Sequence, residues 1–200
     1  MKDTVFRNPT GLDEEGHVTT AYDIALMSRE LLRHEDITRF TTIWMDSLRG
    51  GETALTNTNR LVRFYDGCTG LKTGTTDGAG SCLSATAERD GLSLIAVSMG
   101  SPTSDERFES CRTLLDYGFS AFERFVPEVE IGEIPVIRVK NGVEGYLSPV
   151  LEEPPSLLVV KGRGADVTRT VSVPEEVEAP VEAGQKLGEV TFALDGQMLA

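Results

Sequence analysis

Hydrophobic positions near the start of the chain follow the spacing of an amphipathic helix. Thr20 and Asp23 form a capping-box pattern in which aspartate takes the place of glutamate. Ile24, Met27 and Leu31 then recur at intervals of three and four residues, which places them on one helix face. The sequence therefore predicts a helix that begins after Thr20 and buries this face.

A strand hairpin is predicted after a second, shorter helix over residues 36–40. An apolar run opens a strand at residues 43–45, Gly50-Gly51 supplies the turn, and the chain returns through residues 53–55. The segment 60–67 that follows mixes charged and aromatic side chains. Such a segment either lines a cleft or covers one, and its composition leaves both interpretations open.

Two further strands and a long helix are predicted in the next part of the chain. The runs 81–87 and 92–99 are joined by Arg89-Asp90-Gly91, which is a strong hairpin signal. The small residues of the first run indicate that a helix packs closely on it. Thr103 and Glu106 complete a capping box for a helix that runs to about residue 122. This helix is expected to bury one apolar face, made of Phe108, Cys111, Leu114, Leu115 and Phe119.

From residue 127 onward the chain changes to short valine-rich runs separated by glycine and proline. No helical period is present, and strands at this spacing are typical of a small β-sandwich or barrel. The acidic excess is also denser in this part, so we place a domain boundary near Phe125. The predicted strands cover residues 134–139, 145–150, 156–160, 167–173 and 188–194.

The composition argues against several kinds of site and partner. A net charge of −13 and a pI near 4.6, with no run of basic residues, argue against a nucleic-acid partner. The three cysteines show neither CxxC spacing nor a neighbouring histidine, so no metal site or other cofactor is expected. His17 is predicted in a loop and His34 at a helix end, which disfavours a histidine-dependent catalytic triad.

The clearest candidate chemistry lies in the stretch Gly70-Leu71-Lys72-Thr73-Gly74-Thr75. Lys72 offers a positive charge and three donors, Thr73 offers a hydroxyl, and Gly74 lets a ligand approach the backbone. Together these groups suit an anionic acyl substrate. So short a motif is also typical of an ordinary strand that enters a turn.

Arg107 is a second candidate because of its place in the predicted helix. It lies in the first turn, where the helix dipole favours acidic side chains over cations. Its presence there requires another explanation. Either a ligand or a local ion pair with Asp105 or Glu106 could supply it.

Six segments spread along the chain form an ordered set that is far more specific than Lys-Thr-Gly alone: residues 6–12, 19–25, 57–61, 70–74, 94–97 and 114–119. This set resembles the serine D-alanyl-D-alanine carboxypeptidases, the low-molecular-weight penicillin-binding proteins of peptidase family S11. The resemblance implies an α+β fold. Residues 1–125 are then the C-terminal part of a penicillin-binding-protein/β-lactamase-like transpeptidase domain, an antiparallel sheet with helices. Residues 126–200 are the small all-β, sandwich-like domain that follows it.

The resemblance also implies a role for each candidate residue. In the family reaction a serine attacks the carbonyl between the two D-alanines that end a peptidoglycan stem peptide, and β-lactams inhibit the same enzymes. Lys72 is expected to supply positive potential and a proton relay, and the backbone N–H of Thr75 to be one oxyanion donor. Thr73 and Gly74 are expected to bind the substrate, with Arg107 assisting at its terminal carboxylate.

Two of the three family motifs are absent from these 200 residues. No serine is followed three positions later by lysine, and none begins Ser-x-Asn. We therefore expect an N-terminally truncated member that is inactive by itself and whose β-rich domain lacks its last strand. In the longer protein we expect an extracytoplasmic, envelope-associated enzyme, with the signal peptide and a C-terminal membrane anchor outside the present chain.

Some features of the chain leave other interpretations open. It has no run of about 18 apolar residues and no signal-peptide core, which taken alone is typical of a cytoplasmic protein. A non-catalytic module that binds peptidoglycan peptides or a partner protein is one alternative. A class A β-lactamase is another, since it shares the three-motif chemistry but not the appended β-rich domain.

Overall fold

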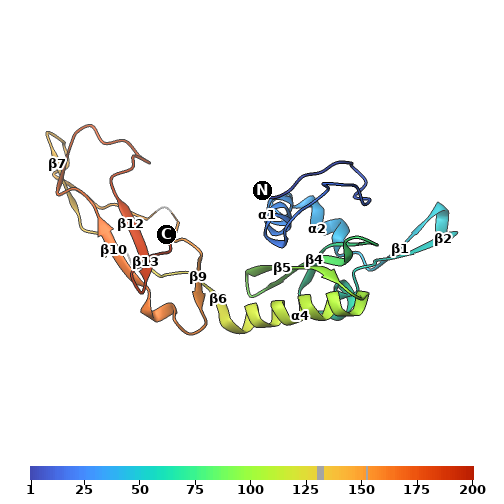
Figure 1. Cartoon of the computed structure of the whole chain (residues 1–200). Coiled ribbons are helices and arrows are strands. Elements are labelled where there is room, and N and C mark those ends of the chain that lie inside the picture. Colours follow the sequence, from blue (N-terminus) through green and yellow to red (C-terminus); the bar gives the residue numbers. More distant parts are fainter. Residues whose placement is uncertain (130–132, 152) are drawn as a thin grey trace. The chain divides into compact units, whose positions relative to one another are not determined.

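The hairpin predicted at Arg89-Asp90-Gly91 lies at the centre of the fold. In the computed structural model, β4 (Gly80–Arg89) and β5 (Leu92–Ser101) pair antiparallel around this turn. Asp90 and Gly91 both have positive φ angles, of 50° and 74°, as the tightest hairpin turns require. β3 (Cys68–Thr76) pairs antiparallel with the other side of β4, which gives the sheet order β3-β4-β5 (Figure 1).

The structure describes residues 1–129, 133–151 and 153–200, and these divide into two compact units. The first is Met1–Ser120 and contains the three-stranded sheet. The second is Ala121–Ala200 and is built of strands. The division lies at the end of the long helix, whereas the sequence placed the boundary near Phe125.

The long helix α4 (Ser104–Ala121) covers one face of the sheet. Phe108, Cys111 and Leu115 are buried against small and apolar residues of β4 and β5, as the apolar spacing predicted. Gly118 allows this close approach, because a Cβ there would lie 2.5 Å from the Leu94 side chain. Leu114 was expected on the same face, but it is 49% exposed because it lies at the border of the apolar face of α4.

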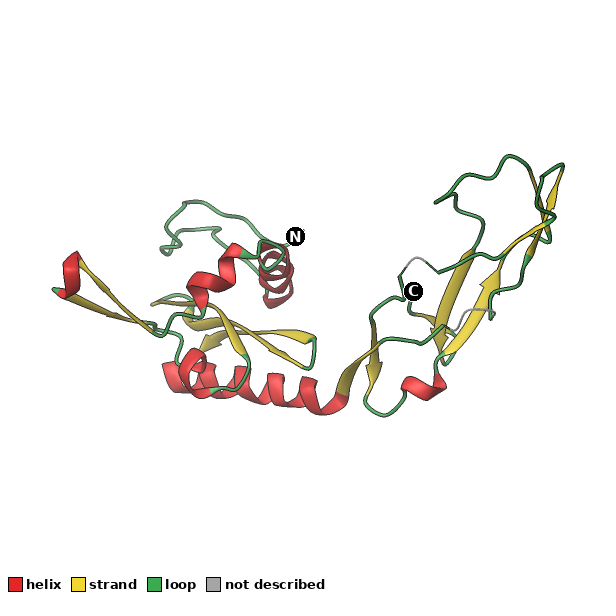
Figure 2. Cartoon of the chain, turned by 180° about the vertical axis from the view of Figure 1, so that it is seen from behind, coloured by secondary structure: helices red, strands yellow, loops and turns green. Residues whose placement is uncertain are grey.

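The helix α1 (Ala21–Leu31) lies on the opposite face of the sheet from α4 (Figure 2). The prediction that Met27 and Leu31 belong to a buried face is wrong, since these side chains are 41% and 37% exposed. The buried positions of α1 are polar. Ser28 lies with its hydroxyl 2.7 Å from that of Ser84 on β4, so a hydroxyl pair replaces the expected apolar contact.

Asp23, the other buried residue of α1, anchors the helix to the N-terminal segment. Its backbone N–H donates to the Thr20 hydroxyl, which confirms the predicted N-cap. Its carboxylate accepts hydrogen bonds from the Thr4 hydroxyl and the Asp3 N–H, at 2.7 and 2.9 Å. Only the threonine half of the capping box is therefore present, because the Asp23 carboxylate accepts from Thr4 and Asp3 and not from the Thr20 N–H.

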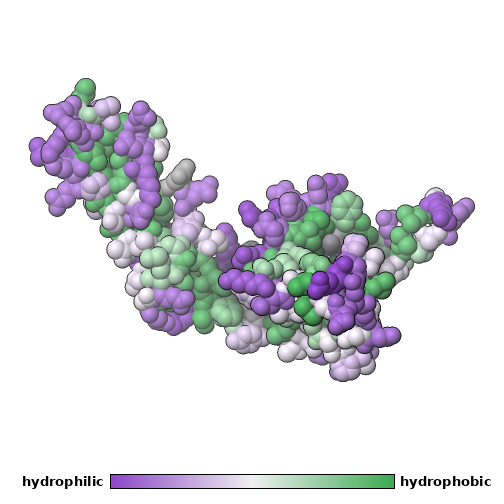
Figure 3. Space-filling model, turned by 45° about the horizontal axis from the view of Figure 1, so that its top comes forward, coloured by the Kyte–Doolittle hydropathy of each residue, from purple (hydrophilic) through white to green (hydrophobic). Residues whose placement is uncertain are grey.

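A long hairpin extends from the first unit (Figure 1). It follows α2 (Asp36–Thr41) and consists of β1 (Met45–Leu48), η1 (Arg49–Gly51) and β2 (Thr53–Thr56). Every residue of both strands is exposed, and both hydrophobic and hydrophilic residues are visible on its surface in Figure 3.

The segment after the hairpin forms a helical turn, α3 (Leu61–Phe64), that the sequence did not predict. Leu61 and Tyr65 are buried in the core beneath α4. The Tyr65 hydroxyl donates to Asp116, and burial raises the pKa of this phenol to about 12. Segment 60–67 therefore contributes to the core as well as to the surface.

The second unit is a small all-β domain, as predicted, with Leu157, Val159 and Phe192 at its core. The elements of this unit are β6 (Phe122–Phe125), β7 (Ile137–Lys140), β8 (Tyr146–Leu147), β9 (Leu157–Val160), η2 (Gly164–Asp166), β10 (Thr168–Ser172), β11 (Glu176–Glu178), β12 (Glu189–Leu194) and β13 (Gln197–Met198). In one sheet β7 is central, parallel to β11 and antiparallel to β8. In the others β12 pairs with both β10 and β13, and β6 pairs with β9.

None of the described helices is long and apolar enough to cross a bilayer.

Adjacent leucines on α4 provide a matched test of this packing. We expect Leu115→Ala to lower the free energy of unfolding by about 2–5 kcal/mol, because it leaves a cavity beneath the sheet. Leu114→Ala, with the same chemical change at an exposed position, is expected to change it by only about 0.5 kcal/mol or less. Urea denaturation followed by circular dichroism measures both, and equal losses would contradict the assigned face.

Candidate functional site

The Lys-Thr-Gly stretch occupies β3, which is an edge strand of its sheet. Among the described strands β3 pairs only with β4, so its other edge carries no strand partner. Lys72, Gly74 and Thr75 are exposed, while Thr73 is only 8% exposed. Because side chains alternate along a strand, Thr73 and Thr75 lie on the same face and Lys72 lies on the other.

The hydroxyl of Thr73 meets a residue from the base of the long hairpin. Its Oγ1 lies 2.8 Å from the Oγ1 of Thr58, which follows β2. The Lys72 side chain also reaches Thr73, since its Nζ donates to the Thr73 backbone carbonyl. A hydroxyl and an ammonium group are therefore both present at this point of the strand.

Arg107 lies beside the next residues of β3, far from it in sequence but in direct contact. The side chain is 7% exposed, and its Nη1 donates to the Gly74 carbonyl at 2.9 Å and to the Thr75 hydroxyl at 3.0 Å. A third bond of 3.2 Å reaches the carbonyl of Cys82 on β4. The structure thus brings the candidates Gly74, Thr75 and Arg107 together.

The ion pair considered as an explanation for Arg107 is not formed. Asp105 pairs instead with Arg60, and the Glu106 carboxylate accepts from the Thr103 hydroxyl at 2.9 Å in the predicted capping box. Within the described part of the chain Arg107 pairs with no carboxylate, and its buried Nε has no hydrogen-bond partner. A buried cation in this condition is costly unless an anion is supplied to it.

A second arginine, Arg60, lies close to Arg107, although its own charge is paired with Asp105. The guanidinium groups of Arg60 and Arg107 lie over the ring of Phe108, with centroid distances of 4.7 and 5.0 Å. Burial lowers the pKa of Arg107 from its ordinary value, and the charge of Arg60 lowers it further. Even so, an arginine remains protonated at neutral pH, so Arg107 keeps its positive charge.

Asp13 is a residue near the site that sequence reasoning missed. Its carboxylate accepts from the Thr76 hydroxyl at 2.5 Å and from the Gly78 N–H at 2.9 Å. These bonds hold the pKa of Asp13 below its ordinary value. The N-terminal segment therefore holds the turn that follows β3. The aspartate lies within none of the periodic patterns, and no local signal pointed to this contact.

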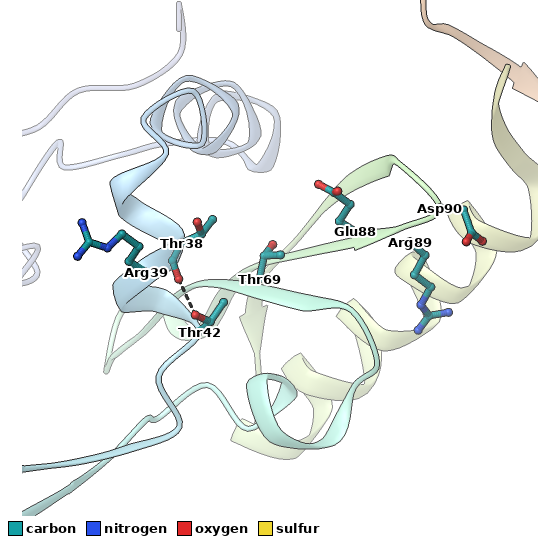
Figure 4. Close-up of a pocket in the computed structure, with 7 residues that line it drawn as sticks. All are labelled: Thr38, Arg39, Thr42, Thr69, Glu88, Arg89 and Asp90. Atoms are coloured by element: carbon teal, nitrogen blue, oxygen red, sulfur yellow. Dashed lines mark hydrogen bonds between the residues drawn. The ribbon is translucent and has the colours of Figure 1, made fainter. Parts of the chain in front are cut away.

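The candidate site is an exposed strand edge, and its residues 72–75 and Arg107 line neither of two cavities found among the described residues. A cavity of ≈ 530 Å³ lies near the start of β3, between α2 and the β4–β5 turn (Figure 4). Arg39 and Arg89 line it but extend away from one another. A cavity of ≈ 240 Å³ lies beside Arg60 and Phe108. Across the described residues no three His, Cys, Asp or Glu side chains are arranged to hold a metal ion.

Comparison with protein families gives two matches. Residues 1–103 match a family model described as D-alanyl-D-alanine carboxypeptidase, and residues 131–200 match one described as penicillin-binding protein 5, C-terminal domain. The chain is 39% identical over 204 residues to the D-alanyl-D-alanine carboxypeptidase DacF of Bacillus subtilis, covering 100% of this chain and 52% of the relative. It is 30% identical over 204 residues to DacA of Escherichia coli K12, covering 100% and 50%.

Solved structures give a similar result. Penicillin-binding protein 5 from Haemophilus influenzae aligns with a TM-score of 0.76 and 28% identity, over 98% of this chain and 58% of that one. Penicillin-binding protein D2 from Listeria monocytogenes, in a cefotaxime-bound form, aligns with a TM-score of 0.54 and 35% identity, over 58% of this chain and 48% of that one. The chain spans about half the length of the curated relatives it matches.

The Asp13 contact predicts a pH-dependent turn. Because the folded-state pKa of Asp13 is depressed, its carboxylate stabilises the turn at pH values above the ordinary aspartate pKa of about 3.9. This stabilisation is lost as the pH falls through the lower folded-state pKa. We expect Asp13→Asn to speed amide exchange at Gly78 at pH 6–7, with the difference from wild type shrinking toward pH 3. Glu15→Gln serves as the control, and an unchanged exchange rate in Asp13→Asn would contradict the role of the contact.

Proposed function

Since the chain belongs to the D-alanyl-D-alanine carboxypeptidase family, we propose that it forms the substrate-recognising part of an enzyme that removes the terminal D-alanine of peptidoglycan stem peptides. The observation that carries this proposal is the buried Arg107. It lies against Gly74 and Thr75 and pairs with no carboxylate of the described chain. The carboxylate at the end of a stem peptide is an anion of the kind that this guanidinium lacks.

The free edge of β3 supports a mode of binding for the peptide. An extended peptide adds to such an edge by main-chain hydrogen bonds. We place its C-terminal carboxylate near the Thr73 hydroxyl and the Arg107 guanidinium, on the face that Thr73 and Thr75 share. Gly74 keeps the other face of the strand clear beside Lys72, because no atom lies within 4 Å of the position that a Cβ would occupy there.

The proposed reaction is an acyl transfer that needs a nucleophile besides these groups. A serine oxygen attacks the carbonyl carbon between the two D-alanines, the C–N bond breaks, and the leaving D-alanine takes up a proton at its amine. Water then hydrolyses the ester. Lys72 contributes positive potential and proton transfer, and the Thr75 N–H donates to the oxyanion. β-Lactams are expected to acylate the same serine, in the cell envelope.

We predict that the 200-residue chain by itself forms no covalent adduct with a fluorescent penicillin. The reason is that it contains no Ser-x-x-Lys motif to supply the nucleophile. Gel fluorescence after incubation measures this, with a complete enzyme of the family as the positive control. A labelled band on the 200-residue polypeptide would contradict the prediction and would favour a nucleophile outside the family pattern.

Joining the chain to an upstream segment that carries Ser-x-x-Lys and Ser-x-Asn is expected to restore labelling. In that protein Lys72→Ala and Thr73→Ala should each reduce the acylation rate by about 10²-fold or more, the scale of losing one transition-state stabilising group. Lys161→Ala, an exposed lysine of the second unit, should leave it unchanged. Unchanged labelling in the Lys72 and Thr73 variants would refute the site assignment, and failure of the joined protein to react would favour a non-catalytic binding module.

The same joined protein tests Arg107. We expect Arg107→Gln to lower kcat/KM for a D-Ala-D-Ala peptide by about ten- to hundredfold, the range for a lost hydrogen bond to a charged group. Arg112→Gln is the matched control, since Arg112 is only half-buried on the same helix and pairs with Glu109. Equal effects of the two substitutions would contradict the assignment of Arg107 to the carboxylate.

A further inference from the structure

The hydroxyl of Thr73 has a protein partner from a distant part of the chain. Thr58 Oγ1 lies 2.8 Å from Thr73 Oγ1, and it is the one side-chain partner of this hydroxyl among the described residues. Thr73 lies on a strand whose position is set by its pairing with β4. Thr58 lies on the segment between β2 and α3, so a separate element supplies the second hydroxyl.

The backbone around Thr58 is held on both sides by asparagines. The Asn57 N–H donates to the Trp44 carbonyl at 2.8 Å, and its side-chain amide donates to the Ile43 carbonyl at 2.9 Å. The Asn57 Oδ1 in turn accepts from the N–H of Asn59, which is buried and caps the following helical turn through the Leu61 N–H. The position of Thr58 is therefore fixed without any contribution from its own side chain.

The direction of the hydrogen bond between the two hydroxyls matters for an anionic ligand. A threonine hydroxyl has one hydrogen to donate and two lone pairs to accept with. Thr73 can donate to a carboxylate only when its hydrogen is not directed at Thr58. In that state Thr58 must be the donor of the pair and Thr73 the acceptor. A chain of hydroxyls oriented in this way is also polarised toward the anion, which strengthens the terminal bond.

We infer that Thr58 is a positioning residue that orients the Thr73 hydroxyl as a donor toward the substrate carboxylate. This inference rests on the proposed function, because it needs a carboxylate at Thr73. On this inference, part of the site's preference for a peptide with a free C-terminal carboxylate comes from Thr58 at the base of the hairpin, which lies outside the Lys-Thr-Gly stretch. Removal of the Thr58 hydroxyl should weaken binding of the acid more than binding of the corresponding amide.

The test compares two substitutions by NMR titration of the 200-residue chain. Thr58→Val keeps the shape of the side chain and removes its hydroxyl, whereas Thr58→Ser keeps the hydroxyl. The probes are N-acetyl-D-alanyl-D-alanine and its C-terminal amide, followed at the amides of residues 72–76. We expect Thr58→Val to reduce the preference for the acid about three- to tenfold and Thr58→Ser to retain it, the scale of one modest hydrogen bond. Thr53→Val, exposed on the same hairpin, should have no effect.

The outcomes separate the two hypotheses. Wild type that binds acid and amide equally would overturn the proposed function, and the role of Thr58 with it. Wild type that prefers the acid, together with Thr58→Val that keeps the full preference, would overturn the role of Thr58 alone. A second measurement needs no ligand: Thr58→Val should increase averaging of the Thr73 χ1 angle, read from three-bond couplings. Unchanged couplings would contradict the positioning role even if the affinities for the probes were too weak to compare.

Discussion

The hydrogen bonds of the buried Arg107 join the long helix α4 to the exposed strand β3, and the candidate site depends on them. One guanidinium nitrogen donates to the carbonyls of Gly74 and Cys82, on two paired strands, and to the Thr75 hydroxyl. A buried charge costs several kcal/mol when it is left unpaired. In this chain the cost is reduced by neutral acceptors and by the Phe108 ring, which leaves the guanidinium able to accept an anion.

Polar contacts also determine how the elements around β3 are placed. A hydroxyl pair joins α1 to β4, the Asp13 carboxylate joins the N-terminal segment to the turn after β3, and a second hydroxyl pair joins the hairpin base to Thr73. Apolar burial is concentrated on the α4 face of the sheet. Thr73 and Thr75 lie on this same α4 face, because Thr73 is paired with the buried Leu83 and Arg107 of α4 donates to the Thr75 hydroxyl. The directional bonds to these two residues fix the orientation of their hydroxyls more narrowly than apolar packing does.

Family membership and local geometry support different parts of the proposed function. Membership of the family supports the proposed reaction. About half of each of these two curated relatives lies outside the region that the chain matches. The geometry concerns recognition, because the groups that the chain itself supplies are an open strand edge, two hydroxyls and a buried cation. In the proposed function these groups bind and orient a carboxylate-ended peptide. The acyl transfer requires a serine nucleophile in addition to them.

The sequence by itself determined the elements whose signals are local. The Asp90-Gly91 turn, the capping box at Thr103 and the apolar spacing on α4 depend on residues close in sequence, so the hairpin, the helix and the all-β character of the second unit could be predicted. Tertiary structure alone decided that α1 buries Ser28 and not Met27, that Thr58 meets Thr73, and that Arg107 lies on Gly74. Each of these depends on a partner distant in sequence, and periodicity specifies a face without specifying what packs against it.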